Sequence, residues 1–218
     1  MSQYRAPLAD MQFVMTELAG LEQIAGLPGF ADATPDTVAA ILEEAAKFAT
    51  DVLDPLNRVG DREGATWRDD GSVATATGFK DAYRQFCELG WNGLAKNPDF
   101  GGQGMPHLVS AAIDEMWSAS NLAFGLCPML TGGAIEAIEL NGSDDLKRTY
   151  LPKMVAGEWT GTMNLTEPQA GSDLAAVRTR AVPEGDGTYK LYGSKIFITY
   201  GEHDYTDNII HLVLARTP

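Results

Sequence analysis

One stretch decides the fold of this chain: Gly161-Thr162-Met163-Asn164-Leu165-Thr166-Glu167-Pro168-Gln169-Ala170-Gly171-Ser172-Asp173. From Trp159 to Thr166, side-chain character alternates with a period of two, which is typical of a β-strand. Pro168 ends this pattern because proline cannot donate to a strand ladder. Ala170-Gly171-Ser172 is a turn of small residues, where backbone can come close to a ligand. Composition alone also allows a plainer interpretation, a strand that ends in an ordinary turn.

Before this stretch, apolar residues recur at helical spacing. Thr34 followed by Pro35 is typical of a helix start, and Ser143 is a candidate N-cap for a later helix. Pro55 indicates that the helix begun at Thr34 weakens there. The spacing predicts six helices, at residues 11–25, 34–53, 79–89, 106–121, 129–140 and from 143 onward. A polar segment at 60–78, with a turn at Asp69-Asp70-Gly71, separates the second helix from the third.

After the stretch, short runs of branched and aromatic residues predict further strands at 177–182, 189–192, 196–199 and 209–214. Glu184-Gly185-Asp186-Gly187 indicates a hairpin between two of them. The expected fold class is α+β, with an all-α helical domain at 1–158 followed by a partial antiparallel β-barrel domain at 159–218. Because about four strands end at Pro218 with their edges uncovered, we expect a β-domain that is cut through its middle.

Charge and composition exclude several classes of partner. The chain has 30 acidic and 16 basic residues, a formal net charge of −14, which disfavours nucleic acid and anionic membrane surfaces. It does not exclude anionic cofactors, because backbone N–H groups can bind a phosphate locally. No secretory signal and no run of about 18 apolar residues is found, so we expect a soluble, cytoplasmic protein. Cys87 and Cys127 are expected to be buried free thiols.

Other motifs predict no site. Gly102-Gln103-Gly104 lacks a third glycine and a preceding strand, so it is not a dinucleotide fingerprint, and no Gly-Lys-Ser/Thr phosphate loop occurs. His107, His203 and His211 have no metal-ligand spacing, and His211 lies in an apolar strand pattern that favours a structural role. We therefore expect no metal site.

The motif Thr166-Glu167-Pro168-Gln169-Ala170-Gly171-Ser172-Asp173 resembles the Thr-Glu-Pro-x-Ala-Gly-Ser-Asp signature of acyl-CoA dehydrogenases. Similarity extends from about Phe79 to Ala215. The N-terminal Tyr4-Arg5-Ala6-Pro7 and the segment Gly201-Glu202-His203-Asp204 resemble the branch that includes methylmercaptopropionyl-CoA dehydrogenases. The further segments that resemble the family are Phe100-Gly101-Gly102-Gln103-Gly104, Tyr150-Leu151-Pro152-Lys153-Met154, Gly157-Glu158-Trp159 and Gly193-Ser194-Lys195-Ile196-Phe197-Ile198-Thr199.

The resemblance implies FAD as cofactor and an acyl-CoA as substrate. It places Met163, Leu165 and Thr166 along the flavin, with Thr166 bonding its pyrimidine side. It places Gly171 and Ser172 near the FAD pyrophosphate, with Ser172 also near the thioester arm of CoA.

On the second flavin segment, Phe197 stands where many family members have tryptophan. This keeps the aromatic face but loses an N–H donor. Ile198 follows, and Thr199 is expected to bond near flavin N5. By resemblance, a carboxylate removes the α-proton of the acyl-CoA while the β-hydrogen passes to the flavin as hydride.

The resemblance places the catalytic base in a C-terminal region, so no catalytic residue is assigned within this chain, and Glu167 is given a structural role. We therefore expect weak or absent FAD binding and no dehydrogenase activity from the chain alone. An electron-transfer flavoprotein is the expected electron acceptor, and the parent protein is expected to be a homo-oligomer. Two other interpretations stay open: an acyl-CoA oxidase fragment, and a non-catalytic helical binding or assembly module. Acyl-chain specificity is not determined by these residues.

Overall fold

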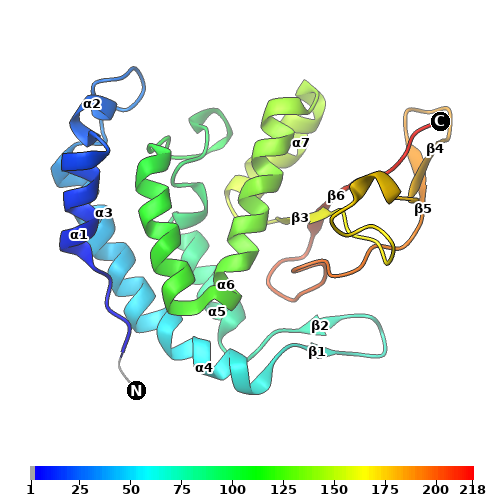
Figure 1. Cartoon of the computed structure of the whole chain (residues 1–218), viewed down its shortest axis with the longest axis horizontal. Helices are drawn as coiled ribbons and strands as arrows, with labels where there is room; N and C mark the ends of the chain where they lie inside the picture. The colour runs from blue at the N-terminus through cyan, green and yellow to red at the C-terminus, as the bar shows by residue number, and fades with distance from the viewer. Residues whose placement is uncertain (1–2) are drawn as a thin grey trace.

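The computed structural model describes residues 3–218, with the helices gathered on one side and the strands on the other (Figure 1). The first predicted helix is interrupted. Gly20 adopts a left-handed backbone conformation, φ 71°, which breaks the helical hydrogen bonding and which glycine adopts without steric cost. The segment comprises α1 (Leu8–Phe13), a π-helical turn η1 (Val14–Leu18) and α2 (Leu21–Ala25).

The second predicted helix begins as expected, since the Thr34 hydroxyl accepts a hydrogen bond from the N–H of Thr37 at 3.2 Å. The expectation that it weakens at Pro55 is wrong. A π-helical turn directly precedes this proline and takes up the break in hydrogen bonding that a proline imposes. The helical path runs through α3 (Pro35–Phe48), η2 (Ala49–Leu53) and α4 (Asp54–Glu63).

The polar segment after α4 holds a small antiparallel hairpin, β1 (Thr66–Trp67) and β2 (Val73–Ala74), around the predicted turn. The turn is closed by the N–H of Gly71 bonding the carbonyl of Arg68 at 2.9 Å. The next helix, α5 (Phe79–Glu88), has the predicted position. Two 3-10 turns follow, η3 (Trp91–Gly93) and η4 (Pro98–Phe100).

The fourth and fifth predicted helices form one long element, α6 (His107–Asn141), broken at Asn121, whose backbone is non-helical (φ −157°, ψ 85°). The Asn121 side chain replaces the lost helical bonds, because its oxygen accepts from the N–H of Phe124 and its amide donates to the carbonyl of Leu53. By length and composition α6 could cross a membrane. In the fold it supplies core side chains to the helical domain. The last helix, α7 (Asp144–Val155), begins at the predicted cap Ser143.

The apolar core is divided into two clusters of buried side chains, and α6 contributes to both. The larger cluster joins α6 to α3, α5 and the N-terminal helices around edge-packed rings such as Phe86 and Trp117. The smaller cluster joins the end of α6 to α7. It comprises Ala134, Ile135, Ile138, Leu151, Met154 and Val155.

The strands depart from the expected antiparallel arrangement. β3 (Thr160–Asn164) pairs in parallel with β6 (Ile209–Val213), because the chain between them makes a long excursion and returns to the same end. That excursion contains a 3-10 turn, η5 (Leu174–Ala176), and the predicted hairpin of β4 (Arg180–Pro183) with β5 (Tyr189–Tyr192), which is antiparallel. Within residues 3–218 the strands form three two-stranded sheets and no closed barrel.

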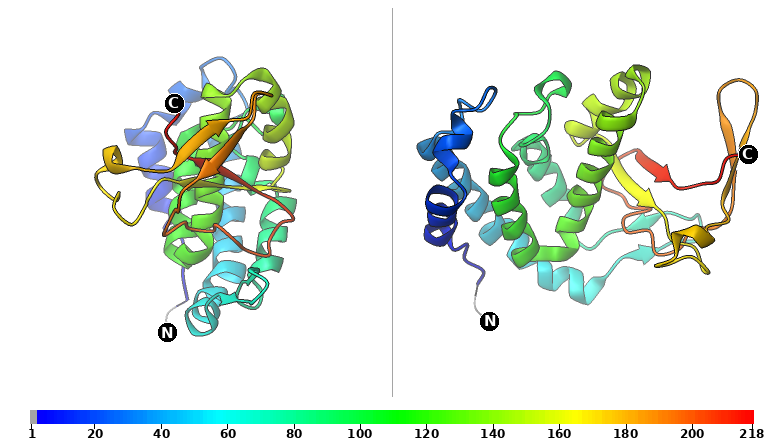
Figure 2. Two further views of the ribbon diagram at one scale, coloured as in Figure 1. Left: turned by 90° about the vertical axis from the view of Figure 1, so that its right-hand side faces the viewer. Right: turned by 45° about the horizontal axis from the view of Figure 1, so that its top comes forward.

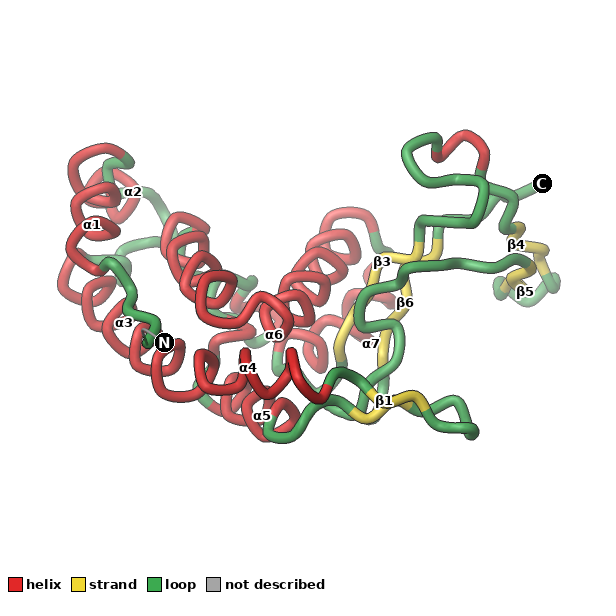
Figure 3. Tube along the Cα trace, turned by 60° about the horizontal axis from the view of Figure 1, so that its bottom comes forward, coloured by secondary structure: helices red, strands yellow, loops and turns green. Residues whose placement is uncertain are grey.

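The β4–β5 hairpin projects away from the helices, and the chain end runs beside it (Figure 2). Arg216 extends the edge of β4, since its backbone exchanges hydrogen bonds with Thr179 and Ala181 at 2.8 Å. Figure 3 shows the β1–β2 hairpin extending past the end of the helical layer on the same side as β3 and β6.

β3 lies directly against α6. The N–H of Gly161 donates to the hydroxyl of Thr131 in α6 at 3.1 Å. A β-carbon added at Gly161 would lie only 2.5 Å from the side chain of Ala134, so this position requires glycine for close approach. The motif that follows β3 is thereby placed beside the helical domain.

Candidate functional site

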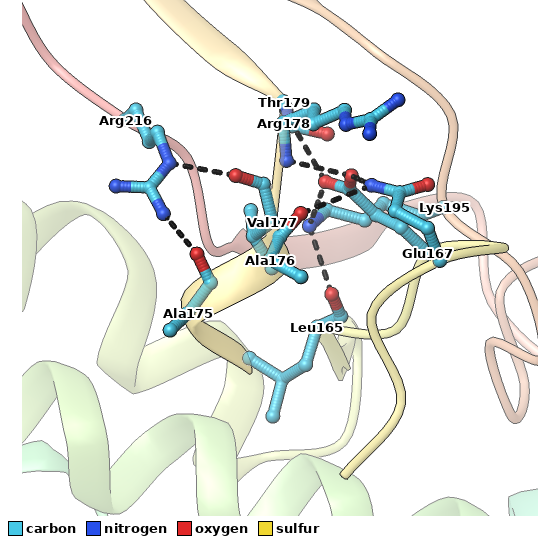
Figure 4. Close-up of polar contacts among 10 residues, drawn as sticks. Leu165, Glu167, Ala175, Ala176, Val177, Arg178, Thr179, Lys195 and Arg216 are labelled. Atoms are coloured by element: carbon cyan, nitrogen blue, oxygen red, sulfur yellow. Dashed lines mark hydrogen bonds and ion pairs between the residues drawn. The ribbon is translucent and has the colours of Figure 1, made fainter. Parts of the chain in front are cut away.

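Glu167 organises the turn that follows β3 (Figure 4). Its side chain is 3% exposed, and the two carboxylate oxygens accept four hydrogen bonds between them. One oxygen accepts from the Gln169 amide at 2.6 Å and the N–H of Arg178 at 2.8 Å. The other accepts from the N–H of Thr179 and the ammonium of Lys195, both at 2.9 Å. The structural role expected for Glu167 agrees with this geometry.

These donors hold Glu167 in its ionised form. The Thr179 hydroxyl, the N–H of Arg178 and the Lys195 ammonium lower the pKa of the Glu167 carboxyl well below its ordinary value, against the opposing effect of burial. The Thr179 hydroxyl lies near the carboxylate, although within the described residues it completes no hydrogen bond of good geometry. An acid held this firmly as a carboxylate, with its oxygens occupied, is poorly suited to act as a general base.

Lys195 connects the motif to the second predicted flavin segment. It is 9% exposed, and besides bonding Glu167 its ammonium donates to the carbonyl of Leu165 at 2.9 Å. At the next residue, the N–H of Ile196 donates to the carbonyl of Thr166 at 3.0 Å. The motif and the segment that begins at Lys195 are therefore in direct contact.

The predicted strand at 196–199 is wrong. Phe197 and Tyr200 have left-handed backbone conformations, φ 58° and 52°, and are the non-glycine residues with positive φ in the described part of the chain. A strand requires extended backbone at each position, so the segment forms a loop. This conformation leaves the Phe197 ring 88% exposed.

An aromatic cluster that the sequence analysis missed packs behind this loop. Tyr205 stacks on Tyr83 of α5 with ring centroids 4.9 Å apart, and His203 lies 5.0 Å from Tyr205. The hydroxyl of Tyr200 donates to the carbonyl of Ala123 in α6 at 2.6 Å. Burial raises the pKa of Tyr200 to about 12, so this donor keeps its proton. The close spacing of the ring-bearing residues Tyr200, His203 and Tyr205 is the sequence pattern that could have indicated this cluster.

The histidines of the β-domain have structural partners. The ring of His203 accepts from the N–H of Tyr205 at Nδ1, so its Nε2 carries the proton and donates to the Thr160 hydroxyl at 2.9 Å. Burial lowers the pKa of His203, which keeps this ring neutral. His211 bonds the Thr162 hydroxyl at 2.7 Å. Among residues 3–218, no group of three or more His, Cys, Asp or Glu side chains could hold a metal ion.

A mainly apolar cavity of about 340 Å³ lies where the helical domain meets the loop. Its walls come from the start of α5, the middle of α6, the β1–β2 hairpin and the loop after Ile198. Thr199 lines it together with Tyr200 and His203. The remaining lining residues are Gly60, Gly64, Ala65, Val73, Thr75, Ala76, Phe79, Ala123, Leu126 and Glu202.

The other predicted site residues have varied environments. Met163 is exposed on β3, whereas Leu165, Thr166 and Ile198 are half-buried. Gly171 and Ser172 are exposed in the turn after the motif. A β-carbon added at Gly171 would meet no atom within 4 Å, so open space lies beside this backbone. The free state predicted for Cys87 and Cys127 is confirmed, but only Cys127 is buried as expected, whereas Cys87 is half-buried.

Two family profiles match the chain: the acyl-CoA dehydrogenase N-terminal domain over residues 35–158 and the acyl-CoA dehydrogenase middle domain over residues 162–218. The chain belongs to the acyl-CoA dehydrogenase family. It is 48% identical over 215 residues to 3-methylmercaptopropionyl-CoA dehydrogenase of Ruegeria pomeroyi, with 99% of this chain and 36% of that protein covered. It is 39% identical to a butyryl-CoA dehydrogenase of Syntrophomonas wolfei, with the same two shares covered.

Solved structures agree with this assignment. A probable acyl-CoA dehydrogenase of Mycobacterium abscessus superposes with a TM-score of 0.68 at 30% identity, over 85% of this chain and 45% of that one. An acyl-CoA dehydrogenase of Bacillus anthracis complexed with FAD superposes with a TM-score of 0.67 at 25% identity, over 84% and 29%. The chain thus spans about a third of the length of the two curated relatives described above.

Proposed function

We propose that this chain is the N-terminal part of an FAD-dependent acyl-CoA dehydrogenase, which oxidises the α,β-bond of an acyl-CoA thioester. The observation that carries the proposal is the direct contact between two segments, 165–167 and 195–199, beside an apolar cavity lined by Thr199. The proposed division places the helical domain at 1–158 and the flavin-binding part of the β-domain at 159–218.

The exposed side chains around this contact fit a flat aromatic cofactor. Phe197 is 88% exposed and Met163 is 37% exposed, and large apolar side chains left open on the surface are typical of interaction sites. Thr166 and Thr199 supply hydroxyl groups beside these apolar surfaces. Gly171 leaves space for the close approach of a phosphate or thioester group. When bound, FAD would supply the hydride acceptor for the reaction.

The chain's own residues have binding and positioning roles in this proposal. Met163, Leu165 and Thr166 form one surface for the cofactor, and Phe197, Ile198 and Thr199 form the second. Gly171 and Ser172 would bind the pyrophosphate, and Ser172 would also contact the substrate arm. The cavity would receive the acyl chain, because its lining is mainly apolar.

The catalytic base and part of the cofactor surface are expected outside residues 1–218, so we propose that the chain alone is inactive. An electron-transfer flavoprotein is the proposed acceptor, as the family resemblance implies. A cytoplasmic homo-oligomer is the proposed state of the parent protein.

A chimaera provides the test. In it, the part of the Ruegeria pomeroyi relative that this chain does not cover would follow Pro218. We expect stoichiometric FAD and acyl-CoA oxidation with an artificial electron acceptor, whereas the 218-residue chain alone shows neither. Thr166→Val with Thr199→Val should reduce FAD retention in the chimaera, and Thr206→Val serves as the control. A folded chimaera that retains no FAD would refute the proposal, as would turnover by the chain alone that is lost in Glu167→Gln.

A further inference from the structure

The loop that presents Phe197 and Thr199 contains unusual backbone strain. Phe197 and Tyr200, three residues apart, both have left-handed conformations that side-chain-bearing residues adopt only at a cost. Such conformations persist when the surrounding structure holds them in place, and they concentrate at ligand sites. The contacts at the two ends of the loop show what holds it.

The first end is held by Lys195. Its buried ammonium bonds both the Glu167 carboxylate and the carbonyl of Leu165, each at 2.9 Å. The backbone of Ile196 is thereby placed against Thr166, which its N–H bonds at 3.0 Å. Glu167 is itself fixed by Gln169 and two backbone N–H groups, so Lys195 is attached to a rigid acceptor. Figure 4 shows Lys195 between Glu167 and Leu165.

The second end is held by Tyr200. Its hydroxyl donates to the carbonyl of Ala123 in α6 at 2.6 Å. Because the Tyr200 hydroxyl proton is already donated to Ala123, the Tyr205 hydroxyl, 3.2 Å away, acts as donor to the Tyr200 oxygen. Directly after Tyr200, the N–H of Gly201 bonds the carbonyl of Ile198 at 3.1 Å and closes the turn. One end of the loop is therefore fixed to the β-domain and the other to the helical domain.

We propose that Lys195 and Tyr200 are positioning residues, which together hold the 196–199 loop in the strained conformation that presents Phe197 and Thr199 to the cofactor. The cofactor part of this inference rests on the proposed function. The positioning part rests on the loop contacts alone. Lys195 holds the loop through a charge-assisted ion pair with Glu167 of the motif, and Tyr200 holds it through a single hydrogen bond to α6.

Amide hydrogen exchange on the 218-residue chain, resolved by residue, tests the positioning. Lys195→Met keeps the aliphatic stem and removes the charge, and Tyr200→Phe removes only the hydroxyl. We expect Lys195→Met to lower protection of the Ile196 amide about tenfold, and Tyr200→Phe to lower that of Gly201 by a similar factor. Lys195→Arg, which retains the positive charge, should keep most of the protection at Ile196.

Matched controls come from β5, where Lys190 forms an exposed ion pair with Glu184 and Tyr189 is exposed. Lys190→Met and Tyr189→Phe should leave the protection of the Ile196 and Gly201 amides unchanged. Unaltered protection at Ile196 in Lys195→Met and at Gly201 in Tyr200→Phe would overturn the inference. Equal loss of protection throughout α6 would also overturn it, because the residues would then support general stability. Equal protection in Lys195→Arg and Lys195→Met would show that charge has no part.

A second measurement separates this inference from the proposed function. FAD is titrated into the chimaera described above, and the visible circular dichroism of bound flavin is recorded for the same variants. We expect about tenfold weaker binding and an altered flavin spectrum in Lys195→Met and Tyr200→Phe. If the unsubstituted chimaera binds no FAD, the proposed function fails while the exchange result still decides the positioning role. Unchanged affinity and spectrum would overturn the cofactor part of the inference.

Discussion

The N–H of Ile196 lies 3.0 Å from the carbonyl oxygen of Thr166, and this one hydrogen bond joins two segments that are 30 residues apart in the chain. It forms where the buried Lys195 side chain reaches the motif, so backbone pairing and the ion pair support each other.

The buried carboxylate makes stability dependent on pH. The pKa of Glu167 is lower in the folded chain than its ordinary value of 4.5, so its ionisation stabilises the fold above that pH. The contribution is lost progressively as pH falls below about 4.5 toward the folded-state pKa. We expect the difference in unfolding free energy between the natural chain and Glu167→Gln to be largest near pH 7 and to shrink at pH 3. Urea unfolding at both values measures it, and a pH-independent difference would contradict the role of the charge.

Relief of strain should stabilise the fold and weaken the site. Phe197→Gly keeps the left-handed backbone but removes the β-carbon that makes it costly, and the ring that is lost is 88% exposed. We expect a gain of about 1 kcal/mol in unfolding free energy, because glycine adopts positive φ without the steric cost. The same change should lower FAD affinity in the chimaera. Ile198→Gly, at the adjacent position without positive φ, is the control and should destabilise the fold.

The break in α6 depends on one buried side chain. Asn121→Ala removes the acceptor for the N–H of Phe124 and the donor for the carbonyl of Leu53, both in the core. Leaving these groups unpaired should cost about 2–4 kcal/mol of unfolding free energy. Asn141→Ala, at the exposed end of the same helix, should cost less than about 1 kcal/mol. Comparable losses in the two variants would show that Asn121 does not hold the break.

The two cysteines should be unreactive in the folded chain. Burial raises the pKa of Cys87 to about 11 and raises that of Cys127 still further. Because the thiolate is the reactive form, Cys87 should react with a disulfide reagent at pH 8 about 100-fold more slowly than a free thiol. Cys127 should react only on unfolding. A thiol count with and without denaturant checks this, and rapid labelling of Cys127 in the folded chain would contradict it.

Helix positions were predictable where local signals act alone. The caps Thr34 and Ser143 lie where the sequence indicates, because a side-chain acceptor next to free backbone N–H groups determines a helix start locally. Pro55 misled the prediction because its effect depends on the π-helical turn before it. The continuity of α6 through Asn121 was equally hidden, since it depends on the carbonyl of Leu53, which is distant in sequence.

In the candidate site too, features set by local sequence were predictable and features set by distant contacts were not. The motif at 166–173 could be identified from the residue pattern and the family resemblance. The strand assigned to 196–199 could not be corrected from sequence, because branched residues favour extended backbone and only the anchors at Lys195 and Tyr200 impose the loop. The aromatic cluster at Tyr205 depends on packing against α5, a relationship that no local pattern contains.

Gly161 sets how closely the segment that carries the motif can approach the helices. The distance between β3 and α6 is limited by a single hydrogen atom at that position, since a methyl group would collide with the side chain of Ala134. An alanine there would displace β3 from α6, and the motif that follows β3 would move with it. The position of the motif relative to the helices is therefore set by a residue that belongs neither to the motif nor to the cavity wall.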